Sequence, residues 1–284
     1  MYDLQLLRSF VAVVECGGFT RAAQALHLTQ STVSQQLRRL EEEVGQSLLD
    51  RQPGRVRPTQ AGERLLGYAR RLLQLGDEAR SAMSGDEREE VVRLGVPEDL
   101  AGAALTPVLS AFARTRTGLR LEVTSGLSGE LSAAYERGEF DVVLVKQRHA
   151  QGARSWPERL VWIDSRDHPC LEMDPLPLAV FPVGGLYREE MFQALDARRT
   201  RWRISYCSAS LASLQAAVAD GLGVSLLPER AVRAGHRVLD GRSGLPAIRP
   251  VRLALHHRRE ASSTVLALVE RLIRRCDQLA TAPA

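Results

Sequence analysis

A short polar segment divides this chain into two parts whose hydrophobic patterns differ. Residues 84–90 are Ser-Gly-Asp-Glu-Arg-Glu-Glu and contain no apolar side chain, so we interpret them as a hinge. Before the hinge, apolar residues recur at helical spacing, whereas after it short apolar runs alternate with helical stretches. With 284 residues, the chain is long enough for two domains. The pattern therefore predicts a small helical domain followed by a larger α/β domain.

Residues 1–58 predict three short helices followed by a turn-rich, basic hairpin. A stripe of apolar residues marks the first helix: Leu4, Leu7, Val11 and Val14. Thr20 is the expected N-cap of a short second helix, and Thr29 is that of a third helix which Gly45 ends. Three helices and a hairpin wing are typical of a winged helix-turn-helix domain, which binds double-stranded DNA.

The predicted third helix separates an apolar face from a face of short polar side chains. Its apolar residues are Val33, Leu37, Leu40 and Val44, and its polar residues include Ser31, Ser34, Gln35 and Arg38. Glutamine can bond the edge of adenine and serine can bond either base type, while Arg38 lies where a phosphate contact is more natural. A solvated helix face is the alternative, but the preceding alanine-rich helix and tight turn at residues 27–28 favour DNA reading.

Residues 59–83 predict one long linker helix, with Thr59 as its N-cap. Small and apolar residues recur along it at spacings of four and three: Leu65, Ala69, Leu72, Gly76, Ala79 and Met83. This seam fits helix-to-helix packing between two copies of the chain. Packing of the same helix on its own domain is the alternative.

Residues 91–284 predict an α/β effector domain of two lobes with a cleft between them, because strand and helix patterns alternate in two sets. Ligands of such folds bind where strand ends and helix starts face the cleft. Loops at such places supply the candidate effector-binding residues Asp99, Ser125, Ser128, Ser208 and Ser210. Ordinary helix capping by these serines is an equal alternative. The carboxylates of Glu98 and Asp99 would repel an anion, so the charge of the ligand stays open. Asp141 is interpreted as structural.

Composition limits the classes of site that this chain can contain. The formal net charge is +4, but residues 1–60 hold seven arginines against six acidic residues. The total charge of this segment therefore does not indicate DNA binding, and the argument depends on the positions of individual side chains. Lys146 is the only lysine, which genomic base composition explains. The spacing of the four scattered cysteines argues against a zinc site, and a Cys170–Cys207 disulfide is an alternative to free thiols. Without a signal peptide or a long apolar run, we expect a cytoplasmic protein.

Three other functional classes compete with a DNA-binding regulator. An enzyme is disfavoured because the histidines are scattered, with no nucleophile and carboxylate at recognisable spacing, and because no phosphate-binding glycine loop is present. A transport solute-binding protein would not need the helix-turn-helix. An architectural DNA binder would leave the α/β domain without a role. We therefore expect a regulator that is not an enzyme, with no metal or cofactor and with a small-molecule effector of unknown identity.

The sequence resembles the LysR-type transcriptional regulators. The residues that carry the resemblance are Leu7–Phe10, Gly18–Ala23, Leu28–Glu41, Leu48, Arg51, Thr59–Gly62, Gly138–Val142 and Ala219–Pro228. Val96–Leu100 and Pro175–Leu178 are similar to the LrhA-like branch of that family. Leu49 and Pro58 depart from the family pattern, at positions where phenylalanine and leucine are usual, and both affect packing of the wing.

The resemblance implies a dimer of dimers held by linker helices, with effector domains like periplasmic binding proteins. It places Gln30, Ser31, Thr32, Ser34 and Gln35 at major-groove positions. In the wing it adds Arg51 and Arg55, the latter at a position that can enter the minor groove. The implied partners are an interrupted palindromic operator, further copies of the chain and, as a candidate, RNA polymerase.

Overall fold

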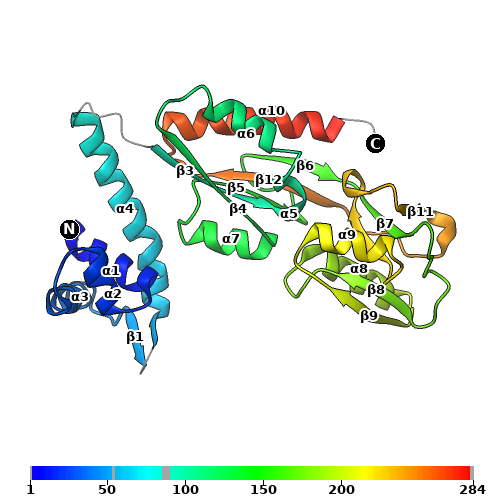
Figure 1. Cartoon of the computed structure of the whole chain (residues 1–284), viewed down its shortest axis with the longest axis horizontal. Coiled ribbons are helices and arrows are strands. Elements are labelled where there is room, and N and C mark those ends of the chain that lie inside the picture. The colour runs from blue at the N-terminus through cyan, green and yellow to red at the C-terminus, as the bar shows by residue number, and fades with distance from the viewer. Residues whose placement is uncertain (1, 53–54, 85–89, 282–284) are drawn as a thin grey trace. The chain divides into compact units, whose positions relative to one another are not determined.

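The chain forms two compact units, described by a computed structural model over residues 2–52, 55–84 and 90–281 (Figure 1). The first unit comprises residues 1–90 with 134–139, and the second comprises residues 91–133 with 140–284. The predicted hinge at residues 84–90 coincides with the boundary, although residues 85–89 lie outside the described part. None of the described helices has the length and apolar character needed to cross a membrane.

The first unit contains the predicted helices and hairpin. Its elements are α1 (Leu4–Cys16), α2 (Phe19–Ala25), α3 (Gln30–Val44), β1 (Leu49–Gln52), β2 (Arg55–Pro58) and α4 (Gln60–Ser84). The strands β1 and β2 pair antiparallel as the hairpin. Five of the fully buried side chains in its core are Leu7, Phe10, Leu37, Leu40 and Leu48. The apolar faces predicted for α1 and α3 therefore meet in one core.

Two of the three predicted helix caps are confirmed. The Thr29 hydroxyl accepts from the Thr32 amide at 3.1 Å, and the Thr59 hydroxyl accepts from the Gly62 amide at 3.1 Å. The prediction of Thr20 as a cap was wrong, because the N-cap of α2 is Gly18, two residues earlier, and the helix begins at Phe19. Gly18 has an extended backbone and its carbonyl accepts from the Ala22 amide, so Thr20 lies inside the first turn.

The linker helix α4 divides the predicted seam between two environments. Ala69 is fully buried in the core of its own unit and Leu65 is partly buried there, as the alternative of own-domain packing requires. The exposed apolar residues of α4 are Tyr68 at 65%, Leu72 at 41%, Leu75 at 61% and the exposed Ala79, and two of them, Leu72 and Ala79, belong to the predicted seam. Among the described residues, the exposed apolar face of α4 thus shares Leu72 and Ala79 with the predicted seam and adds Tyr68 and Leu75.

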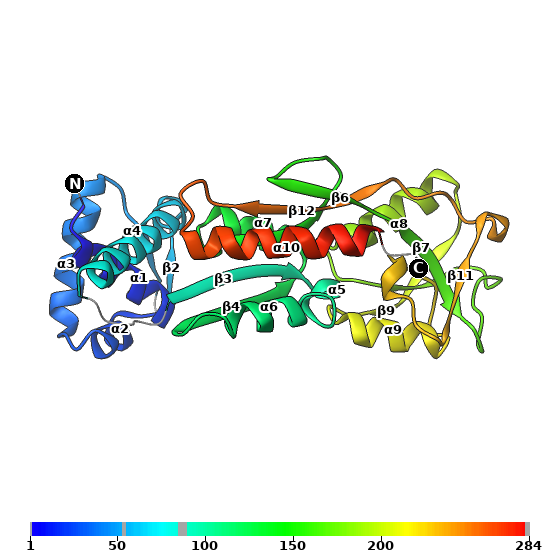
Figure 2. The same ribbon diagram turned by 90° about the horizontal axis from the view of Figure 1, so that it is seen from above.

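The first lobe of the second unit is built on a five-stranded sheet in the order β4-β3-β5-β12-β6. These strands are β3 (Glu90–Pro97), β4 (Leu119–Gly126), β5 (Val142–Gln147), β6 (Arg154–Glu158) and β12 (Val251–His257). The strands β3 and β5 are parallel, which is typical of a strand as uniformly buried and apolar as Val142–Val145, and β12 is antiparallel to β5 and β6. The lobe's helices are α5 (Glu98–Ala101), α6 (Thr106–Ala113), α7 (Ser128–Glu136) and α10 (Ser263–Thr281). Figures 1 and 2 show α6 and α10 over one face of this sheet.

The second lobe has its own core and a mixed set of strands. The strands are β7 (Leu160–Ser165), β8 (Leu176–Val180), β9 (Trp202–Cys207), β10 (Ser225–Pro228) and β11 (His236–Leu239). The helical elements are α8 (Leu186–Ala197), α9 (Leu211–Ala219) and the short 3-10 turns η1 (Glu229–Ala231) and η2 (Gly241–Ser243). The strand β7 lies between β10 and β11, while β8 and β9 are parallel and join β10 through a bridge from Leu178 to Val224.

The chain passes between the two lobes twice. One residue, Arg159, separates β6 of the first lobe from β7 of the second, and residues 240–250 lead back to β12. These passages confirm the predicted two-lobed arrangement with crossing segments. The side chain of Asp141 is structural as predicted, because its carboxylate accepts from the Arg93 amide of β3 at 2.8 Å.

Candidate functional site: a DNA-reading helix and an interlobe pocket

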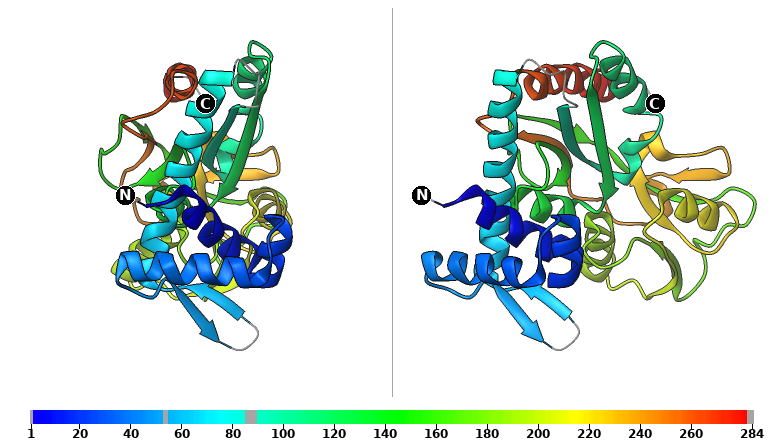
Figure 3. Two further views of the ribbon diagram at one scale, coloured as in Figure 1. Left: turned by 90° about the vertical axis from the view of Figure 1, so that its left-hand side faces the viewer. Right: turned by 60° about the vertical axis from the view of Figure 1, so that its left-hand side comes forward.

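The polar face of α3 is open to solvent while its apolar face is closed. Gln30, Ser31, Gln35 and Arg38 are exposed, and Thr32 and Ser34 are half-buried. Val33, Leu37 and Leu40 on the other side are fully buried. Figure 3 shows α3 and the β1–β2 hairpin at the same end of the first unit. A helix with this division is held rigidly by its buried face and leaves its other face free for base edges.

The hydroxyl groups at the start of α3 bond to one another. The Thr29 oxygen lies 2.8 Å from the Ser31 hydroxyl and 2.7 Å from the Thr32 hydroxyl. Thr29 also caps the helix, so these side chains are positioned before any DNA arrives. Of the predicted reading residues, Gln30 and Gln35 are exposed and carry amides able to bond both donors and acceptors.

The tight turn between α2 and α3 depends on one strained residue. His27 adopts a left-handed backbone with φ of 55°. This conformation ends α2 and redirects the chain into Thr29, as the predicted break at residues 27–28 requires. The side chains of Arg51 and Arg55, predicted to contact DNA from the wing, lie outside the part of the chain that the structure describes.

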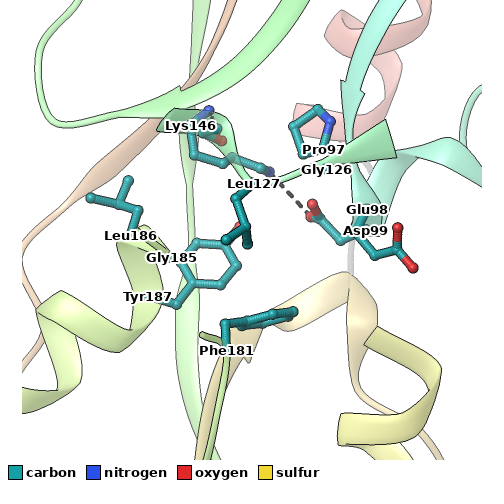
Figure 4. A pocket seen from close by; sticks show the side chains of 11 residues that line it. Pro97, Glu98, Asp99, Gly126, Leu127, Lys146, Phe181, Gly185, Leu186 and Tyr187 are labelled. Atoms are coloured by element: carbon teal, nitrogen blue, oxygen red, sulfur yellow. Dashed lines mark hydrogen bonds and ion pairs between the residues drawn. The ribbon is translucent and has the colours of Figure 1, made fainter. Parts of the chain in front are cut away.

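A pocket of about 40 Å³ lies between the two lobes of the second unit (Figure 4). The first lobe lines it with Pro97, Glu98, Asp99, Gly126, Leu127, Ser128 and Lys146, and the second lobe with Phe181, Gly185, Leu186 and Tyr187. The starts of α7 and α8 therefore both reach the pocket. Their first-turn amides give this region a partial positive charge.

Four charged side chains form a buried cluster at the edge of this pocket. Lys146 contacts Asp99 at 3.2 Å between Nζ and Oδ2, and it also pairs with Glu158. Arg230 of η1 pairs with the same two carboxylates from the second lobe. The side chains of Lys146, Asp99 and Glu158 are at most 5% exposed, and that of Arg230 is 27% exposed. Two cations thus face two anions, and the contacts of Arg230 cross the lobe boundary.

Burial shifts the protonation equilibria within the cluster. Burial lowers the pKa of Lys146 to about 7, although the Asp99 carboxylate favours the charged form. Burial alone would raise the pKa of Asp99, but Lys146 and Arg230 together hold it below its usual value. Burial and then the Asp99 charge raise the pKa of Tyr187 well above its usual value, so its phenol stays protonated.

A second arginine also connects the lobes, but it belongs to the first lobe and contacts carboxylates of the second. Arg148, which follows β5 in the first lobe, donates to Glu190 at 2.7 Å and to Glu189 at 3.0 Å, both in α8 of the second lobe. Glu190 has a side chain only 1% exposed. Each lobe therefore extends one arginine to a pair of carboxylates on the other.

The structure brings two of the five predicted effector residues together. Asp99 and Ser128 line the pocket, and the Ser128 hydroxyl accepts from the Lys146 amide at 2.8 Å. Ser125, Ser208 and Ser210 do not line it. The Ser210 hydroxyl instead accepts from the Ser213 amide and caps α9, as the capping alternative states.

Sequence reasoning did not identify Lys146, Tyr187 and Arg230 as members of this site. Lys146 carried a signal, since the chain's only lysine directly follows Val142–Val145, an uninterrupted apolar run typical of a buried strand. Cys170 and Cys207 are both free, so the disulfide alternative is wrong for this structure.

Two family models match the chain, one on each part. The helix-turn-helix model, "Bacterial regulatory helix-turn-helix protein, lysR family", matches residues 4–63, and the "LysR substrate binding domain" model matches residues 85–277. The chain belongs to the LysR family of transcriptional regulators. This LysR-family protein therefore combines a DNA-binding helix-turn-helix domain with an α/β effector domain.

Named relatives agree with this assignment. The HTH-type transcriptional regulator DgdR of Burkholderia cepacia is 34% identical over 96% of this chain and 93% of its own. The full-length LysG structure of Corynebacterium glutamicum, with bound effector Arg, has a TM-score of 0.67 at 22% identity and covers 98% of this chain and 99% of its own. The full-length CbnR structure, complexed with its target DNA, has a TM-score of 0.59 at 22% identity and covers 96% of this chain and all of its own. The two structures show that the fold is shared.

Proposed function

We propose that this LysR-family protein reads an interrupted, roughly palindromic operator with two copies of α3. The observation that carries the proposal is the exposed set of Gln30, Ser31, Gln35 and Arg38 on a helix whose opposite face is fully buried. In a two-fold dimer, two such helices enter successive major grooves. That CbnR was solved with its target DNA supports the same use of this fold.

The proposed dimer uses the exposed stripe of α4 at Tyr68, Leu72, Leu75 and Ala79. Apolar side chains at spacings of four and three suit packing against a second copy of the same helix. A further pairing of two dimers, and contact with RNA polymerase, belong to the same proposal. In it the protein is cytoplasmic, acts as a regulator and not as an enzyme, and requires no cofactor.

We also propose that a small effector binds in the interlobe pocket and shifts the relative orientation of the lobes. A ligand that touches both lobes can change DNA binding only through its differential affinity for the two arrangements. The supporting observation is the pocket itself, lined from both lobes and flanked by charged contacts that cross between them. That LysG was solved with a bound effector supports effector sensing by a protein of this fold.

Operator binding by the purified full chain, with and without fractions of cell metabolites, tests both proposals. A footprint over two half-sites from a dimer or larger assembly is expected. A footprint over one unrepeated half-site, from a chain that stays monomeric, would contradict the DNA-reading proposal.

Ser128→Ala and Ser210→Ala form a matched pair for the sensing proposal, since both remove a hydroxyl at a helix start. Ser128 lines the pocket whereas Ser210 only caps α9, so the first change should weaken the effector response and the second should preserve it. Equal responses in the two variants would argue against the pocket as the sensing site.

A further inference from the structure

The interlobe pocket contains a buried phenol whose hydroxyl has no partner. Tyr187 is 7% exposed, and its hydroxyl oxygen is buried without a hydrogen-bond partner among the described residues. Leaving a buried polar group unpaired is unfavourable, so such groups in native proteins normally have a partner. Because its phenol keeps its proton, Tyr187 can donate to a group that enters the pocket.

The start of α8 adds donors beside this hydroxyl. Tyr187 lies in the first turn of this twelve-residue helix, and the N-cap residue Gly185 provides no side chain to accept from the first amides. The first amides of a helix have no partner within it. The phenol and the amides therefore belong to one helix turn that faces the pocket.

Lys146 and Ser128 supply further donors from the opposite lobe. An ammonium group has three N–H donors, and the structure gives Nζ of Lys146 two partners, Asp99 and Glu158. The Ser128 oxygen already accepts from the Lys146 amide, which leaves its hydroxyl hydrogen to donate. Donors thus reach the pocket from both lobes.

The acceptors near the pocket are already occupied or turned away. The Asp99 oxygen Oδ2 is shared by Lys146 and Arg230, and Glu158 pairs with the same two cations. In Figure 4 the carboxyl group of Glu98 points away from Tyr187 and Lys146. A ligand group that only accepts hydrogen bonds matches the donors that surround the pocket, and a carboxylate is such a group. An ammonium group would meet mainly these donors, because the carboxylates of Asp99 and Glu158 already pair with Lys146 and Arg230.

The size and lining of the pocket limit the rest of the ligand. The cavity is small, with about 40 Å³ open to water-sized groups. Leu127, Phe181 and Leu186 supply apolar surface beside the donors. A short aliphatic chain beside the carboxylate suits this apolar surface.

We propose that this pocket binds a short-chain aliphatic monocarboxylate, such as acetate or propionate, whose carboxylate accepts from Tyr187, the first turn of α8 and Lys146. This inference rests on the proposed function, because it names the chemical class of the effector of the same site. For about four to five non-hydrogen atoms, the best ligand efficiencies limit Kd to no tighter than about 10 µM. We therefore expect binding between that limit and the millimolar range.

The single lysine makes a direct binding measurement feasible in the full chain. Lysine labelled with ¹³C at Cε gives one lysine signal, that of Lys146, in the otherwise unlabelled protein. Titration with sodium propionate at constant ionic strength should move this signal saturably. Propionamide and propylamine, matched in shape, and sodium chloride should move it little or only at far higher concentration.

Tyr187→Phe removes only the proposed donor, and Tyr206→Phe is its control. The Tyr206 hydroxyl bonds Ser213 in the second lobe and does not line the pocket. We expect Tyr187→Phe to weaken propionate binding about 10- to 100-fold, as for loss of a hydrogen bond to a charged group, while Tyr206→Phe leaves it unchanged. Binding of propionamide as tight as that of propionate, or unchanged binding by Tyr187→Phe, would overturn the proposed ligand class.

Operator binding measured on the same samples separates this inference from the proposed function. If propionate binds through Tyr187 but leaves operator affinity unchanged, the ligand class stands and sensing at this pocket fails. If a compound of another class shifts both the Lys146 signal and operator affinity while carboxylates do neither, sensing stands and the ligand class is overturned.

Discussion

Replacing Arg230 with methionine removes the guanidinium that pairs with Asp99 and Glu158 and keeps an apolar side chain of moderate length. Both carboxylates are at most 5% exposed, so they would be left with Lys146 alone. Removing one partner of a buried ion pair costs about 3–5 kcal/mol, against about 0–1 kcal/mol for an exposed pair. Because Arg230 is itself 27% exposed, we expect a loss near the lower end, about 3 kcal/mol.

A loss of this size is measurable by thermal and urea unfolding of the full chain. For a unit of this size, each kcal/mol lowers Tm by about 2–4 °C, so Arg230→Met should lower it by about 6–12 °C for the second unit. The loss should be fully present at neutral pH. The depressed pKa of Asp99 contributes stability above its unfolded pKa, and that contribution disappears as pH falls through its folded pKa. The difference between wild type and variant should therefore shrink below about pH 4.

Glu158→Gln provides the control, because it removes one of the two charges that Arg230 neutralises. In the Arg230→Met background it should cost less than in the wild type, giving a coupling of about 1–3 kcal/mol in a double-mutant cycle. The reasoning would be refuted by an Arg230→Met cost below about 1 kcal/mol, or by additive effects of the two changes.

Three further outcomes are expected. Gln30→Ala should reduce discrimination between the operator and altered operators by about 1–3 kcal/mol in competition assays, whereas Arg38→Ala should weaken binding to all DNA sequences alike and flatten its salt dependence. An equal loss of affinity for all sequences in Gln30→Ala would show that Gln30 only contacts the DNA backbone. Leu75→Asp, at a position 61% exposed, should shift the chain toward monomer in sedimentation without lowering Tm of the first unit; an unchanged assembly would exclude this face of α4 as the dimer contact. Between pH 7 and 10.5 the unfolded chain binds more protons at Lys146 than the folded chain, so stability should rise with pH across this window, and Lys146→Met should remove that slope. The titratable and charged groups that face Lys146 are Asp99, Glu158, Arg230, Tyr187 and Cys276.

The first unit was largely predictable because its signals are local. Thr29, Gly45 and Thr59 mark helix ends through contacts within a few residues of themselves. The error at Thr20 also has a local cause, since a glycine carbonyl can begin a helix without a side-chain cap. Which face of α4 is free for another copy was harder to predict, because spacings of four and three describe any helix face. Only the fold shows that Ala69 packs inward and Leu75 outward.

The pocket was less predictable because its members meet only through the fold. Strands β6, β7 and β11 were not expected, and Arg230 lies in a short turn between β10 and β11. Nothing near Arg230 in sequence shows that it faces Glu158, 72 residues away. Serines were chosen as ligand contacts because their hydroxyls also suit helix starts, and at Ser210 capping is what the structure shows.

The single residue between β6 and β7 restricts how the lobes can move. Consecutive Cα atoms are about 3.8 Å apart, so Arg159 allows almost no sliding of one lobe past the other at this point. The return connection at residues 240–250 is longer and can absorb the motion. Rotation about an axis through Arg159 is therefore the movement that the backbone permits most easily. Glu158 sits next to that axis, so a few degrees of rotation displace it little. Inserted residues should accordingly be tolerated between 240 and 250, while a single extra residue at 159 would loosen the connection between β6 and β7 and with it the restriction on how the lobes move.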